Sequence, residues 1–215
     1  MKRAVILIAG LASMHASTAA AETRAQVDWA KGIVTAPGVG VADRHAPNPA
    51  VARGTSRRKA EDAGRKALGE AVARLPLATG GTVGDNLTDP AVAKRIAHAV
   101  EGAYAIAAEP ETDGAWTVIM ALPLEAVRQA LTGPRALAAN ASDTGPTVVV
   151  VEGVTTDPAI GTMVGGIAGA TLWVKQVPAW AKEAPRIKAK GAARGAIDAD
   201  VGTATPSTLF VLIAK

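Results

Sequence analysis

The sequence predicts an α+β protein in which one long helix, over about residues 48–75, packs on a small, mostly antiparallel sheet. Two observations predict this class. A long segment with helical apolar periodicity follows a β-rich segment, and further short β-rich segments come later in the chain. Two of these segments are joined by Asp113-Gly114, a turn signal typical of hairpins. Additional short helices complete the prediction.

The long helix has a clear beginning and two distinct faces. Asn48 can cap free backbone N–H groups, and the ring of Pro49 suits the first helical turn. Apolar residues recur at helical spacing on one face, at Ala60, Ala63, Ala67, Leu68, Ala71, Val72 and Leu75. The other face carries opposite charges four residues apart, such as Arg57 with Glu61. Each exposed pair contributes only about 0.2–0.5 kcal/mol, so the pairs support the helix without deciding the fold.

The segment from Val27 to Val41 is predicted to form one strand before this helix. It contains Gly38-Val39-Gly40, which superficially resembles the start of a dinucleotide-binding fingerprint. The third glycine is absent because Asp43 stands at its place, and the helix begins too late to meet a pyrophosphate. We therefore interpret the glycines as a kinked or bulged strand end.

Cap, turn and apolar signals predict the remaining elements. A shorter helix follows Thr88-Asp89-Pro90 and ends at Gly102. Further predicted elements are strands at Ala103–Ala108 and Ala115–Leu122, a helix from Pro123 to Leu131, a linker at Ala136–Pro146, strands at Thr147–Val154 and Leu209–Ala214, and an irregular basic loop at Pro178–Gly195. The last strand is expected to be buried on both faces because it is continuously apolar.

Residues 1–21 have the three parts of a secretory signal peptide. Lys2-Arg3 is the basic start, Ala4–Ala12 the apolar run, and Ala19-Ala20-Ala21 the small-residue cleavage site. The apolar run is shorter than the roughly 20 residues that span a bilayer. We expect cleavage after Ala21 and export of the mature chain. Residues 22–135 then form the α+β domain, and the glycine-rich, β-containing residues 136–215 are assigned to the same domain, although two domains stay possible.

The run from Pro158 to Val174 is uncharged and contains Gly161, Gly165 and Gly169. A glycine-rich loop and strand is the favoured interpretation, because glycine disfavours a helix by about 1 kcal/mol per residue. Small-residue spacing also suits close helix packing in membranes, with Trp173 at the interface. Self-association or a partner patch is the third alternative.

Few residues offer chemistry. The absence of cysteine excludes disulfides, thiolate metal sites and a Cys nucleophile. His45 and His98 are isolated candidates for acid–base or metal chemistry, and Asp157, Asp198 and Asp200 are candidate carboxylates in glycine- and alanine-rich loops. No catalytic, cofactor-binding or metal-binding residue is therefore predicted, and we expect a protein that is not an enzyme.

Charge also narrows the class of partner. The formal net charge is +4, and removal of the signal peptide with its two basic residues leaves +2. The basic residues alternate with acidic ones, and aromatic residues make up only 3% of the chain. A nucleic-acid-binding surface requires a clustered basic stripe, so we expect no nucleic acid partner.

Three segments carry a family resemblance. Lys31–Val41 ends in a glycine-rich "G-x-G", Asn48–Arg53 opens the helix, and Arg57-Arg58-Lys59-Ala60-Glu61-Asp62-Ala63 continues it with paired arginines. With the hairpin Asp113–Val118, this order resembles the bacterial lipoprotein-twenty family and the N-terminal domain of the flagellar assembly protein T. The resemblance covers about Trp29–Leu131. The chain departs from the lipoprotein members because it lacks the lipid-bearing cysteine.

The resemblance implies a long helix on a small sheet and a location in the periplasm or at the outer membrane. Together with the signal peptide, it leads us to expect an exported, non-enzymatic cell-envelope protein that acts through contacts with envelope proteins or through self-association, with peripheral membrane contact possible. A flagellar motor or outer-ring accessory component is one alternative. A periplasmic enzyme or ligand-binding protein is another.

Overall fold

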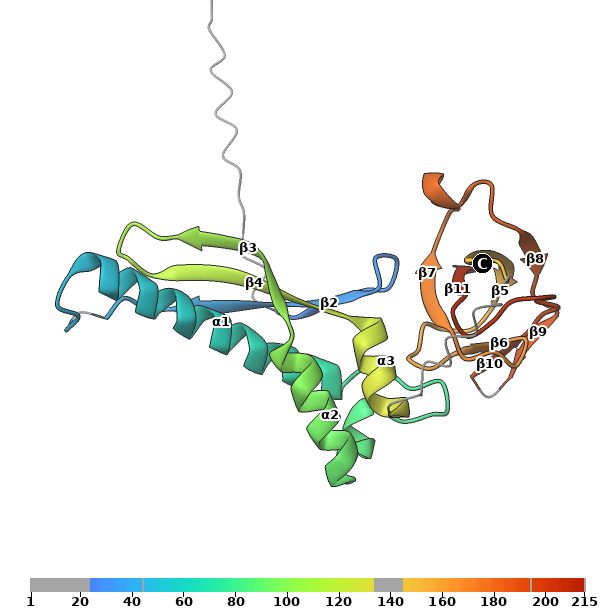
Figure 1. Ribbon diagram of the computed structural model, residues 1–215, viewed down its shortest axis with the longest axis horizontal. Coiled ribbons are helices and arrows are strands. Elements are labelled where there is room, and N and C mark those ends of the chain that lie inside the picture. The colour runs from blue at the N-terminus through green and yellow to red at the C-terminus, as the bar shows by residue number, and fades with distance from the viewer. Residues whose placement is uncertain (1–23, 44, 134–144, 194, 215) are drawn as a thin grey trace, which may run out of the picture.

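The computed structural model describes residues 24–43, 45–133, 145–193 and 195–214 and has a mixed α+β fold, as the sequence predicts. Two lobes lie side by side (Figure 1). The N-terminal lobe holds a four-stranded sheet and the three α-helices of the described chain, and the C-terminal lobe holds a four-stranded and a three-stranded sheet. The predicted signal peptide and most of the predicted linker lie outside the described residues.

The N-terminal sheet has the order β1-β2-β4-β3, and all its neighbours are antiparallel. Its strands are β1 (Gln26–Asp28), β2 (Ile33–Gly40), β3 (Tyr104–Pro110) and β4 (Trp116–Pro123). The predicted β3–β4 hairpin is confirmed.

The prediction of one strand over Val27–Val41 is wrong, because the segment folds into a hairpin of β1 and β2. The Asp28 carboxylate accepts hydrogen bonds from the N–H groups of Ala30 at 3.1 Å and Lys31 at 2.9 Å. Gly32 follows with a φ of 66°, a conformation that favours glycine. An Asp that turns the chain and a Gly that completes the turn are the physical reason for the break.

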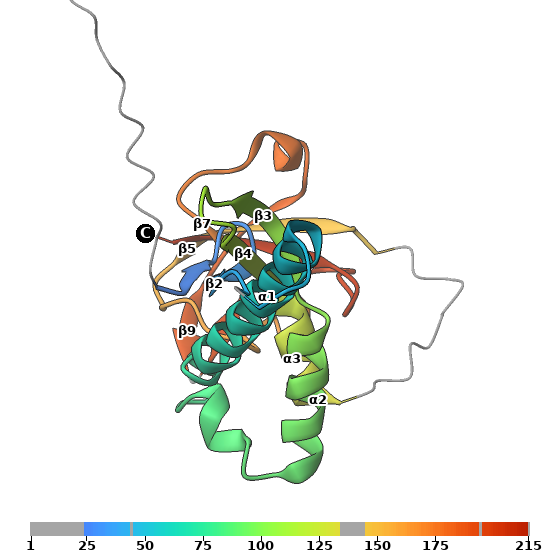
Figure 2. The same cartoon turned by 90° about the vertical axis from the view of Figure 1, so that its left-hand side faces the viewer.

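The long helix α1 (Pro49–Ala73) packs along one face of this sheet, against β2 and β4 (Figures 1 and 2). The side chain of Asn48 caps it by accepting from the Val51 N–H at 3.0 Å. Of the predicted charge pairs, Arg57 lies 3.2 Å from Glu61 and Arg65 lies 3.9 Å from Glu61.

Gly38 and Gly40 allow this close approach of helix to sheet. A Cβ atom on Gly38 would collide with the Ala60 carbonyl oxygen, and one on Gly40 with that of Ser56. The pairing of β2 with β4 is continuous from Ile33 to Gly40, so the prediction of a kinked or bulged strand end is wrong. The glycines remove side chains where two backbones meet.

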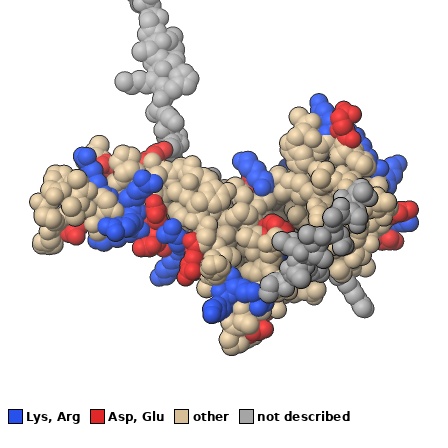
Figure 3. Space-filling view, viewed as in Figure 1, with Lys and Arg blue, Asp and Glu red and all other residues tan. Residues whose placement is uncertain are grey.

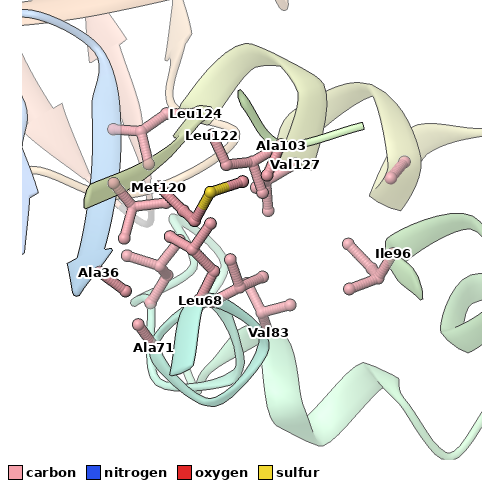
Figure 4. Close-up of a cluster of buried hydrophobic side chains, with 14 of the residues drawn as sticks. Ala36, Leu68, Ala71, Val83, Ile96, Ala103, Met120, Leu122, Leu124 and Val127 are labelled. Carbon is pink, nitrogen blue, oxygen red and sulfur yellow. The ribbon is translucent and has the colours of Figure 1, made fainter. Parts of the chain in front are cut away.

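The N-terminal core lies between α1, the sheet and the shorter helices (Figure 4). Leu68 from α1 and Met120 from β4 are almost fully buried there. Two members of the buried face of α1, Ser56 and Gly64, were not predicted, and predicted Ala63 is exposed. Small residues at positions 56, 60 and 64 allow this part of α1 to lie close to the sheet.

Three further helical segments close this lobe: η1 (Val83–Asn86), α2 (Pro90–Glu101) and α3 (Leu124–Thr132). The Asp89 carboxylate caps α2 by accepting from the Ala91 N–H at 2.8 Å. The Arg95 guanidinium donates to the Ala130 carbonyl at 2.6 Å and ties α2 to the end of α3. Both predicted short helices are confirmed.

The C-terminal lobe contains an entirely parallel sheet of order β7-β11-β5-β8. Its strands are β5 (Val148–Val154), β7 (Ala170–Val174), β8 (Arg186–Lys188) and β11 (Leu209–Ala214). As predicted, β11 is buried on both faces: Phe210 and Leu212 lie in one core cluster, and Val211 in another. These strands form no ladder with the N-terminal sheet.

A second, smaller sheet holds β6 (Met163–Val164), β9 (Gly191–Ala193) and β10 (Ala196–Asp198) in the order β6-β10-β9. The predicted irregular loop Pro178–Gly195 thus contains β8 and β9, and also the short η2 (Ala179–Ala181). The glycine-spaced run from Pro158 forms turns, β6 and β7. In the described part of the chain, no helix is long and apolar enough to cross a membrane.

Backbone hydrogen bonds join the two lobes at two places. The Ala78 N–H donates to the Ile160 carbonyl, and the Ile160 N–H donates to the Pro76 carbonyl, both at 2.9 Å. The Trp173 N–H donates to the Trp29 carbonyl at 3.0 Å. Ile160 is only 5% exposed and belongs to the N-terminal core, so the C-terminal lobe is anchored in its neighbour.

Candidate interaction site

The histidines and carboxylates named from the sequence do not converge. His45 is exposed, and its backbone N–H donates to Asp43 at 2.9 Å. His98 lies 3.6 Å from Glu101, and both side chains are largely in solvent. Asp157, Asp198 and Asp200 are exposed, and within the described ranges no group of three His, Asp or Glu residues could hold a metal ion.

A groove of about 720 Å³ lies where the first hairpin meets the C-terminal lobe. One wall is formed by residues 26–30, which comprise β1 and the start of its turn. The other wall is formed by the end of β7 and the segment after it, at Trp173, Val174, Lys175, Gln176, Pro178 and Trp180. Segments almost 150 residues apart in the sequence therefore build one surface.

Three of the four tryptophans in the chain line this groove, and they differ in role. Trp173 is 5% exposed and belongs to the C-terminal core. Trp29 is half-buried and packs against the cores of both lobes, so it fixes the position of the hairpin. Trp180 is 59% exposed and follows Pro178. It offers a large apolar surface to a ligand at low entropic cost, because its side chain has only two rotatable bonds.

Both walls are sheet edges. Among the described residues, β1 pairs only with β2, and β7 only with β11. The Trp173 N–H points away from β11, since it donates to Trp29. Lys175 follows β7 in a bend, at the end of this edge. The groove therefore lies between two strand edges and is lined by indole rings.

The hairpin wall is held in shape by Asp28. Its carboxylate accepts the two turn N–H groups and lies 3.2 Å from the Lys31 ammonium. Partial burial raises the pKa of Asp28, but the hydrogen bond from the Lys31 backbone N–H, the Lys31 ammonium and the Ala30 N–H outweigh this effect and hold the pKa below its ordinary value. The side chain is thus ionised at neutral pH and keeps the turn closed.

A smaller cavity of about 220 Å³ lies between the two joints of the lobes. Leu124, Leu172 and Leu209 contribute to its apolar lining. At its rim, Arg128 forms a paired contact with Glu125, with both N···O distances at 2.6 Å. Arg128 is paired with Glu125, and Lys31, which also lines the cavity, is paired with Asp28. We regard this cavity as part of the junction.

Sequence reasoning missed the groove because its two walls come together only through the fold. The available signal was weak: Trp29, Trp173 and Trp180 are conspicuous in a chain with few aromatics, but their spacing shows no pattern. The last two residues of the run Pro158–Val174 line the groove, at the end of β7. A partner patch was one of the alternatives considered for this run.

No family model matches the chain, and no curated protein sequence matches it significantly. The resemblance to the lipoprotein-twenty family and to the flagellar assembly protein T stays a prediction from sequence.

Proposed function

We propose that the chain is an exported, non-enzymatic cell-envelope protein that binds an extended peptide segment of an envelope partner in the tryptophan groove. The observation that carries this proposal is the groove itself, in which the edge strands β1 and β7 lie beside the exposed ring of Trp180. Export rests on the signal-peptide features of residues 1–21.

The geometry favours a peptide in extended conformation. Such a peptide can add to an open sheet edge through its main chain, while alternate side chains enter pockets beside the edge. The free edge of β1 is available for main-chain pairing, and Val27, which is 36% exposed, and Trp180 supply apolar contacts. The walls carry few charges, so we expect apolar rather than ionic side chains at the contact positions.

The test uses the full-length chain in cells, with a photoreactive phenylalanine analogue in place of Trp180. Irradiation is expected to give a discrete adduct, in which mass spectrometry identifies the cross-linked partner peptide. The same analogue in place of Met163, which is 39% exposed on β6, is the control and should not give this adduct.

A synthetic copy of the identified peptide then gives the affinity by fluorescence anisotropy. Trp180→Ala is expected to weaken binding at least about tenfold, because buried tryptophans dominate interface energies. Met163→Ala should leave the affinity unchanged. The proposal is overturned when position 180 gives no adduct, when both positions give the same adduct, or when Trp180→Ala binds the peptide as tightly as the wild type.

Cell fractionation tests the compartment separately. We expect a mature chain whose mass corresponds to cleavage after Ala21, recovered from the periplasm or released from the outer membrane by a salt wash. An uncleaved chain in the cytoplasm would contradict the envelope assignment.

A further inference from the structure

Within the described residues, no helix or strand packs on the face of the N-terminal sheet opposite α1, although Ala121 in it is fully buried. This face carries few charged side chains: Glu109 on β3 and, at the β1 edge, Asp28. Register places three rows of outward side chains on it: Thr35, Ala121 and Tyr104; Pro37, Ile119 and Ala107; Val39, Thr117 and Glu109. Antiparallel sheets with one face in water usually alternate apolar and polar residues. Here Glu109 is the only charged residue in the three rows. Val39 is 59% exposed and Tyr104 49% exposed.

The same apolar character continues onto the free edge at β3. In the described part of the chain this strand pairs only with β4, and residues 104–107 are all exposed. Its first five residues, Tyr104 to Ala108, carry no charge, and Ile106 is 52% exposed. Natural proteins usually protect such edges with charged side chains, proline or a bulge. In β3 the charged residue and the proline come only at the end of the strand, at Glu109 and Pro110. Its first five residues contain a bulge, at the register shift between Ala105 and Ala107, and no other such feature.

We propose that β3 pairs with β3 of a second copy of this chain, antiparallel across a two-fold axis, so that two four-stranded sheets form one continuous sheet. A pairing centred on Ala107 places Ile106 opposite Ala108 of the other copy and Tyr104 opposite Pro110. Glu109 meets Ala105, so no like charges face each other. Opposite partners of this kind stabilise a strand pair, whereas opposed like charges destabilise it.

Charge distribution favours a second copy over a charged partner. Many ionic residues of this lobe lie on α1, on the opposite face of the sheet, and the space-filling view shows charged groups along this helix (Figure 3). A two-fold axis at β3 keeps both copies of α1 on one side and unites the two sparsely charged faces on the other. Two identical neutral edges attract without electrostatic steering, so the association is expected to be slow and insensitive to salt.

The β3 edge is also independent of the tryptophan groove. In the order β1-β2-β4-β3, the groove lies at β1 and the proposed contact at the opposite edge. A variant that prevents pairing of β3 therefore leaves the groove intact, and failure of either proposal is visible without the other.

The absence of cysteine makes the first test direct. Ala107→Cys in the mature chain, residues 22–215, places one thiol on the proposed two-fold axis. Directly opposed residues of antiparallel strands have Cα atoms about 4.5–5.5 Å apart, within the range that a disulfide requires. Under mild oxidation we expect a covalent dimer that reducing agent dissociates. Ala97→Cys, which is exposed on α2, is the matched control and should stay monomeric.

Sedimentation equilibrium provides the second test. The wild-type mature chain is expected to show a reversible monomer–dimer equilibrium within about 1–100 μM, a range suited to a small interface. Ile106→Lys should weaken the dimer at least tenfold, with an unchanged circular dichroism spectrum because the side chain is exposed. Val51→Lys, at a site 45% exposed on α1, makes the same kind of change away from β3 and should preserve the dimer.

A wild-type chain that stays monomeric over this range would overturn the proposal. So would Ile106→Lys chains that dimerise as well as the wild type, or Ala97→Cys chains that cross-link as fast as Ala107→Cys chains.

Discussion

At the scale of single residues, glycines set the distance between α1 and the sheet. Gly38 faces backbone atoms of Ala60 and Gly64, so an added methyl group has nowhere to move. This is a packing role that the flexibility of glycine does not explain, since Gly38 has an ordinary backbone conformation. Gly69, by contrast, lies in α1 with no atom within 4 Å of a Cβ built on it.

Two alanine substitutions are therefore expected to act in opposite directions. Gly38→Ala should lower the free energy of unfolding by about 1–3 kcal/mol, because α1 must move off the sheet. Gly69→Ala should raise it by about 0.5–1 kcal/mol, because alanine favours the helix. Urea unfolding followed by circular dichroism measures both. Equal effects of the two substitutions would contradict the close contact of helix and strand.

Asp28 is expected to contribute a pH-dependent part of the stability. Its pKa is below the ordinary value in the folded state, so its stabilising contacts are present above the unfolded pKa of about 3.8 and are lost as the pH falls through the lower folded value. Because the side chain is partly in solvent, the contribution at neutral pH should be below about 1 kcal/mol.

Asp28→Asn tests this contribution, because it removes the charge and retains an oxygen that can accept the turn hydrogen bonds. The difference in unfolding free energy between wild type and Asp28→Asn is expected to be largest at neutral pH and to shrink below pH 4. Denaturant titrations at several pH values measure it. A difference that grows on acidification would mean that Asp28 has a raised pKa in the fold.

At the scale of elements, the sequence predicts a helix correctly where the residues at its start carry a capping signal. Asn48 and Pro49 predict the start of α1, and the capping signal at Asp89 predicts α2. The role of Gly38 was misjudged because sequence periodicity describes one strand and not the helix above it. The prediction of a single strand over Val27–Val41 overlooked Asp28 and Gly32, two residues that favour turns.

The candidate interaction surfaces were harder still to predict from the sequence, because they depend on contacts between distant segments. The groove requires β1 and β7 to meet, and only the joined lobes bring them together. The apolar character of the sheet face opposite α1 was predictable in part. Residues 116–123 of β4 form an almost continuously apolar strand, a pattern typical of burial on both faces.

At the scale of the whole molecule, the junction of the lobes determines whether the groove exists. The lobes have separate sheets and mostly separate cores, yet Ile160 crosses from one to the other. Its carbonyl and N–H groups also form the bridge to the segment after α1. Gly195 supports this joint, because a Cβ there would collide with the Ala78 backbone. The hairpin wall of the groove belongs to one lobe and the Trp180 wall to the other.

Ile160→Ala is therefore expected to destabilise the whole chain, although the residue lies in a loop. Removing a side chain that is 5% exposed should lower the free energy of unfolding by about 2–4 kcal/mol. Met163→Ala, three residues away and 39% exposed, should change it by less than about 0.5 kcal/mol. Urea unfolding followed by tryptophan fluorescence measures both, because Trp29 and Trp173 lie at the second joint. Equal, small effects would show that the lobes hold together without Ile160, and the groove would then depend on the Trp29–Trp173 contact alone.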